Sequence, residues 1–161
     1  MKPGTLAGVL AGIVIVFTCA AVYFSVSGPL PPANTALVDA DATKEVTDQV
    51  SRAIRTVFSY DPTQLDHTAT EAQKLLTGQA ITQYNAIFTQ AKAHAVTTQQ
   101  VLTTAVRSAG VIEMHGDNAK LLVFVDRQIV AGDQHQSAAG QLVVTAVKSG
   151  GIWQITEIQL L

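Results

Sequence analysis

Residues 140–158 read GQLVVTAVKSGGIWQITEI, and their pattern gives the clearest indication of the fold. Apolar side chains at Leu142, Val144 and Ala146 alternate with their neighbours, which is the two-residue period of a β-strand with one buried face. Ser149-Gly150-Gly151 interrupts that period and has the composition of a tight hairpin connection. We therefore predict two antiparallel strands, the second of which lies at or near an edge of the sheet.

Two further strands are expected immediately before this hairpin. β-branched and alternating residues follow Thr97, with a bulge predicted at Ala109-Gly110 and a turn at 115–118. Residues 120–126, KLLVFVD, form the most apolar strand, and the polar stretch after it has the composition of a hairpin loop. The result is a four-stranded antiparallel meander with strands over about 101–114, 120–126, 140–148 and 152–158.

In the residues that precede the sheet, apolar side chains recur at the three- and four-residue spacing of a helix. A first helix begins at Asp39 or Asp41, either of which can act as an N-cap, and ends before Asp61-Pro62. Its apolar face is expected to contain Val46, Val50, Ala53, Ile54, Val57 and Phe58.

Two shorter helices follow the first. One spans about 66–76, with Gly78 as its C-terminal cap, and the other ends around His94. The stripe of the latter is Ile81, Tyr84, Ile87, Phe88 and Ala91. Helices followed by a meander predict an α+β domain over 39–161, in which three helices cover one face of a curved antiparallel sheet.

Residues 6–26, LAGVLAGIVIVFTCAAVYFSV, contain no charge and are long enough to cross a bilayer as a helix. With Lys2 before this run and Asp39 and Asp41 after it, the positive-inside rule predicts a cytoplasmic tail over 1–5 and an extracytoplasmic domain. The Pro-rich residues 27–38 then form a spacer. This predicts a single-pass protein of the cell membrane.

Two other interpretations of the apolar run stay open. Ser25 and Ser27 have the spacing of a signal-peptide cleavage site before Gly28, although the run is longer than a signal core. A lipoprotein is disfavoured because Cys19 lies in the middle of the run.

Gly4, Gly8 and Gly12 recur at four-residue spacing, which creates a small-residue face suited to contact with another membrane helix. Small residues are also common in membrane helices that make no such contact. These three glycines are therefore candidate residues for a transmembrane helix contact.

Composition excludes several functions. The 161 residues have a formal net charge of -2 and no run of Lys or Arg, so an electrostatic footprint for nucleic acid is missing. The only cysteine lies in the apolar run, which leaves the predicted domain without a thiol for a disulfide or a metal. We predict no cofactor.

No spacing matches a phosphate loop, a zinc site or a nucleophile elbow. Asp133 and His135 could act with His115 or Asp117 only if two loops met at one end of the sheet, and solvated loop residues explain them better. Asp126 and Arg127 end an apolar strand and could face a cavity, although charged residues at a strand end more often meet water or each other. Trp153 is expected to be a core anchor rather than a stacking group. We predict no catalytic residue.

Five short motifs, spread from the first predicted helix to the last strand, together carry a family resemblance. With its apolar N-terminal run, the chain resembles the Mce-associated membrane proteins of actinobacteria through Tyr60-Asp61-Pro62, Leu75-Leu76-Thr77-Gly78, Gly110-Val111, Leu122-Val123-Phe124-Val125-Asp126 and Gly151-Ile152-Trp153. The resemblance implies a nuclear transport factor 2-like cone, a fold also used by an inner-membrane subunit of type IV secretion systems. It also implies an accessory role beside mammalian-cell-entry lipid importers and no established active site.

The leading hypothesis is a non-catalytic membrane-anchored scaffold that stabilises or assembles an Mce-type lipid-import complex, with transporter subunits as partners. The first alternative is a module that binds a lipid or small hydrophobe in the cavity of the cone, with Phe58, Tyr84, Phe88 and Phe124 as candidate walls. The second alternative is a scaffold of another envelope complex, for secretion or cell-wall assembly.

Overall fold

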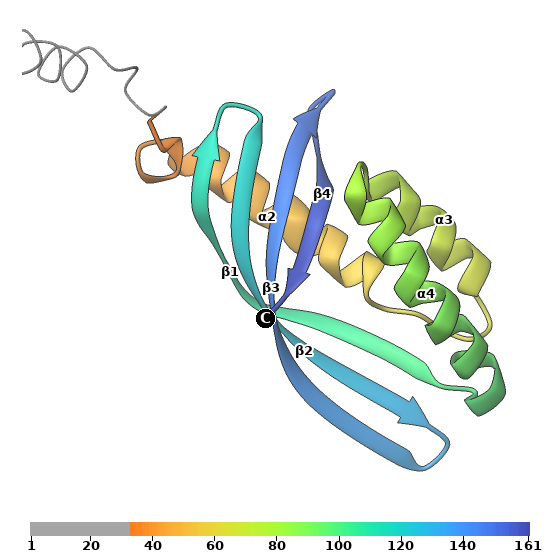
Figure 1. Ribbon diagram of the computed structural model, residues 1–161. Coiled ribbons are helices and arrows are strands. Elements are labelled where there is room, and N and C mark those ends of the chain that lie inside the picture. Colours follow the sequence, from red (N-terminus) through yellow and green to blue (C-terminus); the bar gives the residue numbers. More distant parts are fainter. Residues whose placement is uncertain (1–32) are drawn as a thin grey trace, which may run out of the picture. The chain divides into compact units, whose positions relative to one another are not determined.

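A short 3-10 turn and three helices precede four strands in the computed structural model, which describes residues 33–161 (Figure 1). The elements are η1 (Thr35–Leu37), α2 (Ala40–Val57), α3 (Leu65–Leu75), α4 (Gln79–Thr98), β1 (Val101–His115), β2 (Asn118–Ala131), β3 (Gln134–Ser149) and β4 (Ile152–Leu160). The α+β prediction of three helices and a four-stranded antiparallel sheet is confirmed.

The predicted membrane segment 6–26 and the candidate contact residues Gly4, Gly8 and Gly12 lie outside the described residues. No helix within residues 33–161 is both long and apolar enough to cross a membrane.

Helix α2 begins where its sequence predicts. The Asp39 carboxylate accepts a hydrogen bond from the N–H of Ala42 at 2.8 Å, which satisfies one of the free donors of the first turn. Five of the six residues of the predicted apolar face are buried, whereas Phe58 is partly buried at the C-cap, and α2 ends at Val57, before Asp61-Pro62. This helix supplies one wall of the core.

The folded unit begins at Asn34, within the stretch predicted to be spacer. The Asn34 side chain accepts a hydrogen bond from the N–H of Met114 at 2.9 Å and donates one to the carbonyl of Ile112 at 3.0 Å. The Thr35 hydroxyl donates to the Met114 carbonyl at 3.0 Å. Residues 34–38 are therefore part of the domain, because polar side chains attach them to the edge of β1.

The sheet has the strand order β1-β2-β3-β4, with every neighbouring pair antiparallel. Register shifts in β1 fall between Val106 and Ser108 and between Val111 and Glu113, whereas Gly110 pairs regularly with Leu122. The bulge predicted at Ala109-Gly110 is therefore wrong, because the two irregularities lie on either side of that position. Figure 1 shows that the strands bend near the C terminus, so that the sheet curves.

Strands β2 and β3 continue well beyond their predicted ends. They pair without interruption from Asn118 with Val147 to Ala131 with Gln134, and only Gly132 and Asp133 form the turn. Gly132 has a φ of +58°, a conformation that glycine adopts without strain. The loop predicted after residue 126 is thus mostly strand. Backbone pairing between β2 and β3 keeps these residues extended although they bury no apolar face.

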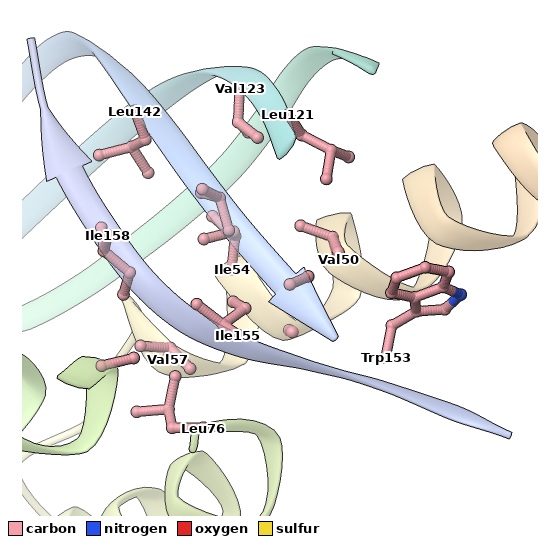
Figure 2. Packing of buried hydrophobic residues seen from close by; sticks show 14 of the residues in the cluster. Val50, Ile54, Val57, Leu76, Leu121, Val123, Leu142, Trp153, Ile155 and Ile158 are labelled. Atoms are coloured by element: carbon pink, nitrogen blue, oxygen red, sulfur yellow. The ribbon is translucent and has the colours of Figure 1, made fainter. Parts of the chain in front are cut away.

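The core lies between α2 and the inner face of the sheet (Figure 2). Trp153 is 2% exposed, which confirms it as a core residue. The fully buried side chains from both layers include Val46, Val50, Ile54, Met114, Leu121, Val123, Val144 and Ile155.

Helices α3 and α4 differ from the sequence-based expectation at their junction. Leu76 leaves the helix and forms a parallel bridge with Ile155, and Gly78 is the N-cap of α4 rather than the C-cap of α3. Ile81 and Ile87, predicted to be buried, are 36% and 49% exposed. The two isoleucines are exposed because α4 packs through Ala80, Tyr84 and Ala95 instead. The helix also continues to Thr98, beyond its predicted end.

Candidate functional site

An apolar hollow of about 400 Å³ lies where α4 and the end of α2 diverge from the sheet. Helix α4 contributes Tyr84, Ile87 and Phe88, and the strands contribute Leu102 and Ile158. The remaining lining residues are Val57, Phe58, Tyr60, Gln83, Ala86, Ala91, Arg127 and Leu160. The size and the apolar walls match those of small-molecule pockets.

Tyr84 is the most deeply buried polar residue of this hollow. Its ring stacks on Phe88 with 5.0 Å between the ring centroids, and the residue is 5% exposed. Its hydroxyl is buried and has no hydrogen-bond partner among the described residues. Burial raises the pKa of Tyr84 to about 12, because the phenolate loses its hydration.

Arg127 brings a charge to the same hollow. In the register it lies opposite Thr104 on β1 and Ala138 on β3, and these cross-strand neighbours share the inner face of the sheet. The side chain is exposed, and it forms no ion pair with any carboxylate of residues 33–161. The hollow therefore combines apolar walls with one positive group.

The structure brings three of the four candidate cavity residues together. Phe58, Tyr84 and Phe88 line the hollow, whereas Phe124 lies elsewhere and is 38% exposed. Val123 and Val125 are buried, so Phe124 between them points to the opposite face of the sheet. Because residues 121–125 are all apolar, the sequence does not show which of them face the core.

The charged residues singled out in the sequence do not form a reactive set. The β1–β2 turn that carries Asp117 and the β2–β3 turn that carries Asp133 lie at opposite ends of β2. Asp126 instead pairs with Arg107 on the neighbouring strand. Within the described part of the chain, no three His, Cys, Asp or Glu side chains gather as a metal site would require.

A second feature is the way in which the sheet edges are covered. On the outer edge of β4, the N–H of Trp153 donates to Gln49 Oε1 at 2.9 Å and the N–H of Ile158 donates to Gln83 Oε1 at 3.0 Å. The N–H of Thr77 donates to the carbonyl of Ile155 at 2.8 Å. Helix residues and the α3–α4 junction thus occupy the positions of a fifth strand.

The outer edge of β1 is protected in a different way. Tyr60 exchanges two backbone hydrogen bonds with Leu102, and the Asn34 side chain covers the other end. Between them the strand contains both register shifts and the charged Arg107. Bulges and charges are devices that prevent an edge from pairing with another chain.

Residues Gln134–Gly140 of β3, which we term the β3 edge, have neither form of protection. β4 pairs with β3 only from Leu142 onward, and no other strand of residues 33–161 borders this segment. The sequence QHQSAAG contains no Pro, Lys, Arg, Asp or Glu, and the register with β2 has no bulge.

The direction of the free backbone groups follows from the two-residue turn. Gln134 closes this turn against Ala131, so His135, Ser137 and Ala139 direct their N–H and C=O groups away from β2. The N–H of Leu161 donates to the carbonyl of Gln141 at 3.1 Å, which continues the same alternation. The β3 edge therefore offers a row of donors and acceptors to an added strand.

Sequence comparison finds relatives in one organism. No protein-family model matches the chain. It is 33% identical over 122 residues to the uncharacterised proteins Rv1362c and MT1407 of two Mycobacterium tuberculosis strains. The alignment covers 74% of this chain and 56% of each relative, so the chain spans about half the length of these curated relatives.

Several solved structures with a similar fold are secretion-system proteins. CagV, a VirB8 homologue of Helicobacter pylori, has a TM-score of 0.62 at 12% identity, over 73% of this chain and 96% of that one. An IcmL-like type IV secretion protein of Legionella pneumophila has a TM-score of 0.64 at 10% identity, over 73% and 91%. The periplasmic domain of DotI has a TM-score of 0.63 at 8% identity, over 83% and 99%. At these identities the likeness establishes the fold and not the activity.

Proposed function

We propose that this chain is a non-catalytic scaffold that joins a cell-envelope protein complex by accepting a partner strand at the β3 edge. The observation that carries the proposal is the uncovered backbone of Gln134–Gly140, beside two other edges that the fold blocks. Main-chain hydrogen bonds supply affinity in strand addition, and pockets for alternate side chains supply specificity.

Side chains next to the β3 edge favour such a partner. Phe124 lies opposite Gln141 on the outer face, which makes it an exposed apolar neighbour of the free strand. It borders a hollow of about 540 Å³ that also contains Arg107, Asp126 and Gly140. An added strand would find both a backbone ladder and a site for one of its own side chains.

The fold similarity supports the envelope setting, since the solved structures with a similar fold include a periplasmic domain and two secretion-system proteins. In this proposal residues 6–26 anchor the protein in the membrane and the domain lies outside the cytoplasm. The more specific form of the proposal, which rests on the Mce-associated resemblance, is that the complex is an Mce-type lipid importer. A secretion or cell-wall complex is the alternative partner.

The test is affinity purification of the full-length protein from its native membrane, compared between Ser137→Pro and Ser137→Thr. Proline removes an N–H that faces away from β2 and is tolerated on edge strands, whereas threonine keeps the N–H. Thermal unfolding of both variants checks that the domain folds.

We expect Ser137→Pro to lose the partner that Ser137→Thr retains. Recovery of lipid-importer subunits with the threonine variant would support the more specific form, and recovery of secretion or cell-wall proteins would support the alternative. Equal recovery of partners by both variants would exclude the β3 edge as the contact.

A further inference from the structure

We infer that the apolar hollow between α4 and the sheet binds a single-chain amphiphile with an anionic head group. This goes beyond the scaffold function, because the hollow faces the inner side of the sheet and shares no lining residue with the β3 edge. The walls hold the alkyl chain, and the head group lies beside Arg127.

The walls favour an alkyl chain over a polar ligand. Phe58 just after α2, Phe88 of α4, Leu102 of β1 and Ile158 of β4 surround a volume of about 400 Å³. Ile87 and Leu160 line the hollow and are 49% and 61% exposed, so apolar surface faces water there. Covering that surface with a chain is favourable in proportion to its area.

The positive charge of Arg127 favours an anionic head group. Among the described residues that line the hollow, Arg127 is the one that carries a charge, and it forms no ion pair within residues 33–161. A planar guanidinium binds carboxylate or phosphate oxygens through paired hydrogen bonds. A cationic head group would meet only repulsion at this position.

The Tyr84 hydroxyl provides a second, independent indication of a ligand. This hydroxyl belongs to a residue that lines the hollow and is buried without a partner in the described chain, although buried hydroxyl groups nearly always form a hydrogen bond. An oxygen of a bound ligand would satisfy this donor, which no described residue does.

The test uses full-length protein in nanodiscs of uncharged phosphatidylcholine and a diazirine analogue of lauric acid as photolabel. Laurate, dodecyl phosphate, dodecanol and dodecyltrimethylammonium compete for labelling, and mass spectrometry maps the labelled peptides. We expect labels on α4 and the end of β4, with the two anions competing at least tenfold better than dodecanol. The stronger of the two anions identifies the head group.

Four variants distinguish binding in the hollow from general partition into the membrane. Ile87→Trp fills the hollow from an exposed position, while Ile81→Trp places the same side chain on α4 outside it. Arg127→Gln removes the charge, and Arg52→Gln removes an exposed charge elsewhere.

We expect Ile87→Trp to lower labelling at least tenfold and Ile81→Trp to leave it unchanged. Arg127→Gln should abolish the preference for anions over dodecanol, whereas Arg52→Gln should not. Shortening the fatty acid should weaken competition by about fourfold per methylene. Labelling outside the hollow, equal effects of the two tryptophan variants, or equal competition by laurate and dodecanol would each overturn the inference.

Discussion

Gln49 of α2 accepts a hydrogen bond from the backbone N–H of Trp153 in β4 at 2.9 Å. A helix side chain therefore serves the edge of a strand more than 100 residues away in the sequence. The same glutamine donates to Glu45 and to the carbonyl of Gly151, so α2 is attached to the β3–β4 hairpin as well as packed against the sheet. The contact both stabilises the domain and closes this edge to other chains.

Replacement of Gln49 by Met tests this contact, because methionine keeps the length of the side chain and removes its oxygen. We expect Gln49→Met to lower the free energy of unfolding by about 1–3 kcal/mol, since the Trp153 N–H loses its partner in a partly buried position. Urea unfolding measures the change. Gln73→Met on the exposed face of α3 is the control, with an expected change within about 0.5 kcal/mol.

Gly78 should be the glycine that is hardest to replace. Its φ of +56° and ψ of -134° form a combination that residues with a Cβ rarely adopt, and it starts α4 directly after the Leu76 bridge. We expect Gly78→Ala to destabilise the domain by about 1–3 kcal/mol. Gly110→Ala should be neutral or stabilising by up to about 1 kcal/mol, because a Cβ there meets no atom within 4 Å. Equal costs in thermal unfolding would contradict this assignment.

Tyr84 and Tyr60 should respond in opposite ways to loss of their hydroxyl groups. The Tyr60 hydroxyl accepts a hydrogen bond from Gln100 at 3.1 Å, so Tyr60→Phe should cost about 0.5–1.5 kcal/mol. The Tyr84 hydroxyl is buried without a partner, so Tyr84→Phe should leave the stability at neutral pH unchanged or raise it.

Alkaline pH should enlarge the difference in stability between the wild-type protein and Tyr84→Phe. Burial raises the pKa of Tyr84 from 10.0 to about 12, so the unfolded state releases its proton first as the pH rises. Stability contributed by Tyr84 is therefore complete below pH 10 and decreases toward pH 12, and Tyr84→Phe should remove that part of the loss. An identical alkaline decrease in the variant would show that Tyr84 is not the group responsible.

Asp61 should contribute to the loss of stability in acid. The hydroxyl of Thr63 and then its N–H donate to the Asp61 carboxylate, and these bonds lower the pKa of Asp61 below its usual 3.8. A lowered pKa means that the contribution is present above pH 3.8 and is lost as the pH falls below it. NMR titration of the carboxyl carbon should give a midpoint below 3.8 that rises in Thr63→Val. A midpoint unaffected by that substitution would contradict the assigned cause.

Local patterns predicted the core-forming elements well. Leu142, Val144 and Ala146 have the two-residue period of a half-buried strand, and all three are buried. Asp39 carries the signal of an N-cap and acts as one. In both cases the signal is local, because a few adjacent side chains determine the conformation.

The candidate sites depend on information that local patterns lack. Residues 134–139 are exposed on both faces, so no hydrophobic period marks them as strand, and only their pairing with β2 makes them one. Phe124 lies in an apolar run whose faces cannot be told apart before the position of α2 is known. Arg127 reaches the hollow because the pairing with Thr104 places it on the inner face, a relation between distant residues.

The most direct test of the scaffold account is residue-resolved hydrogen exchange on the full-length protein, alone and in its purified envelope complex. In the protein alone, the amides of Ser137 and Ala139 should exchange much faster than those of Gln136 and Ala138, which face β2. In the complex, strand addition at the β3 edge should strongly protect the amides of Ser137 and Ala139. Unchanged fast exchange of these two amides in the complex would contradict strand addition at the β3 edge.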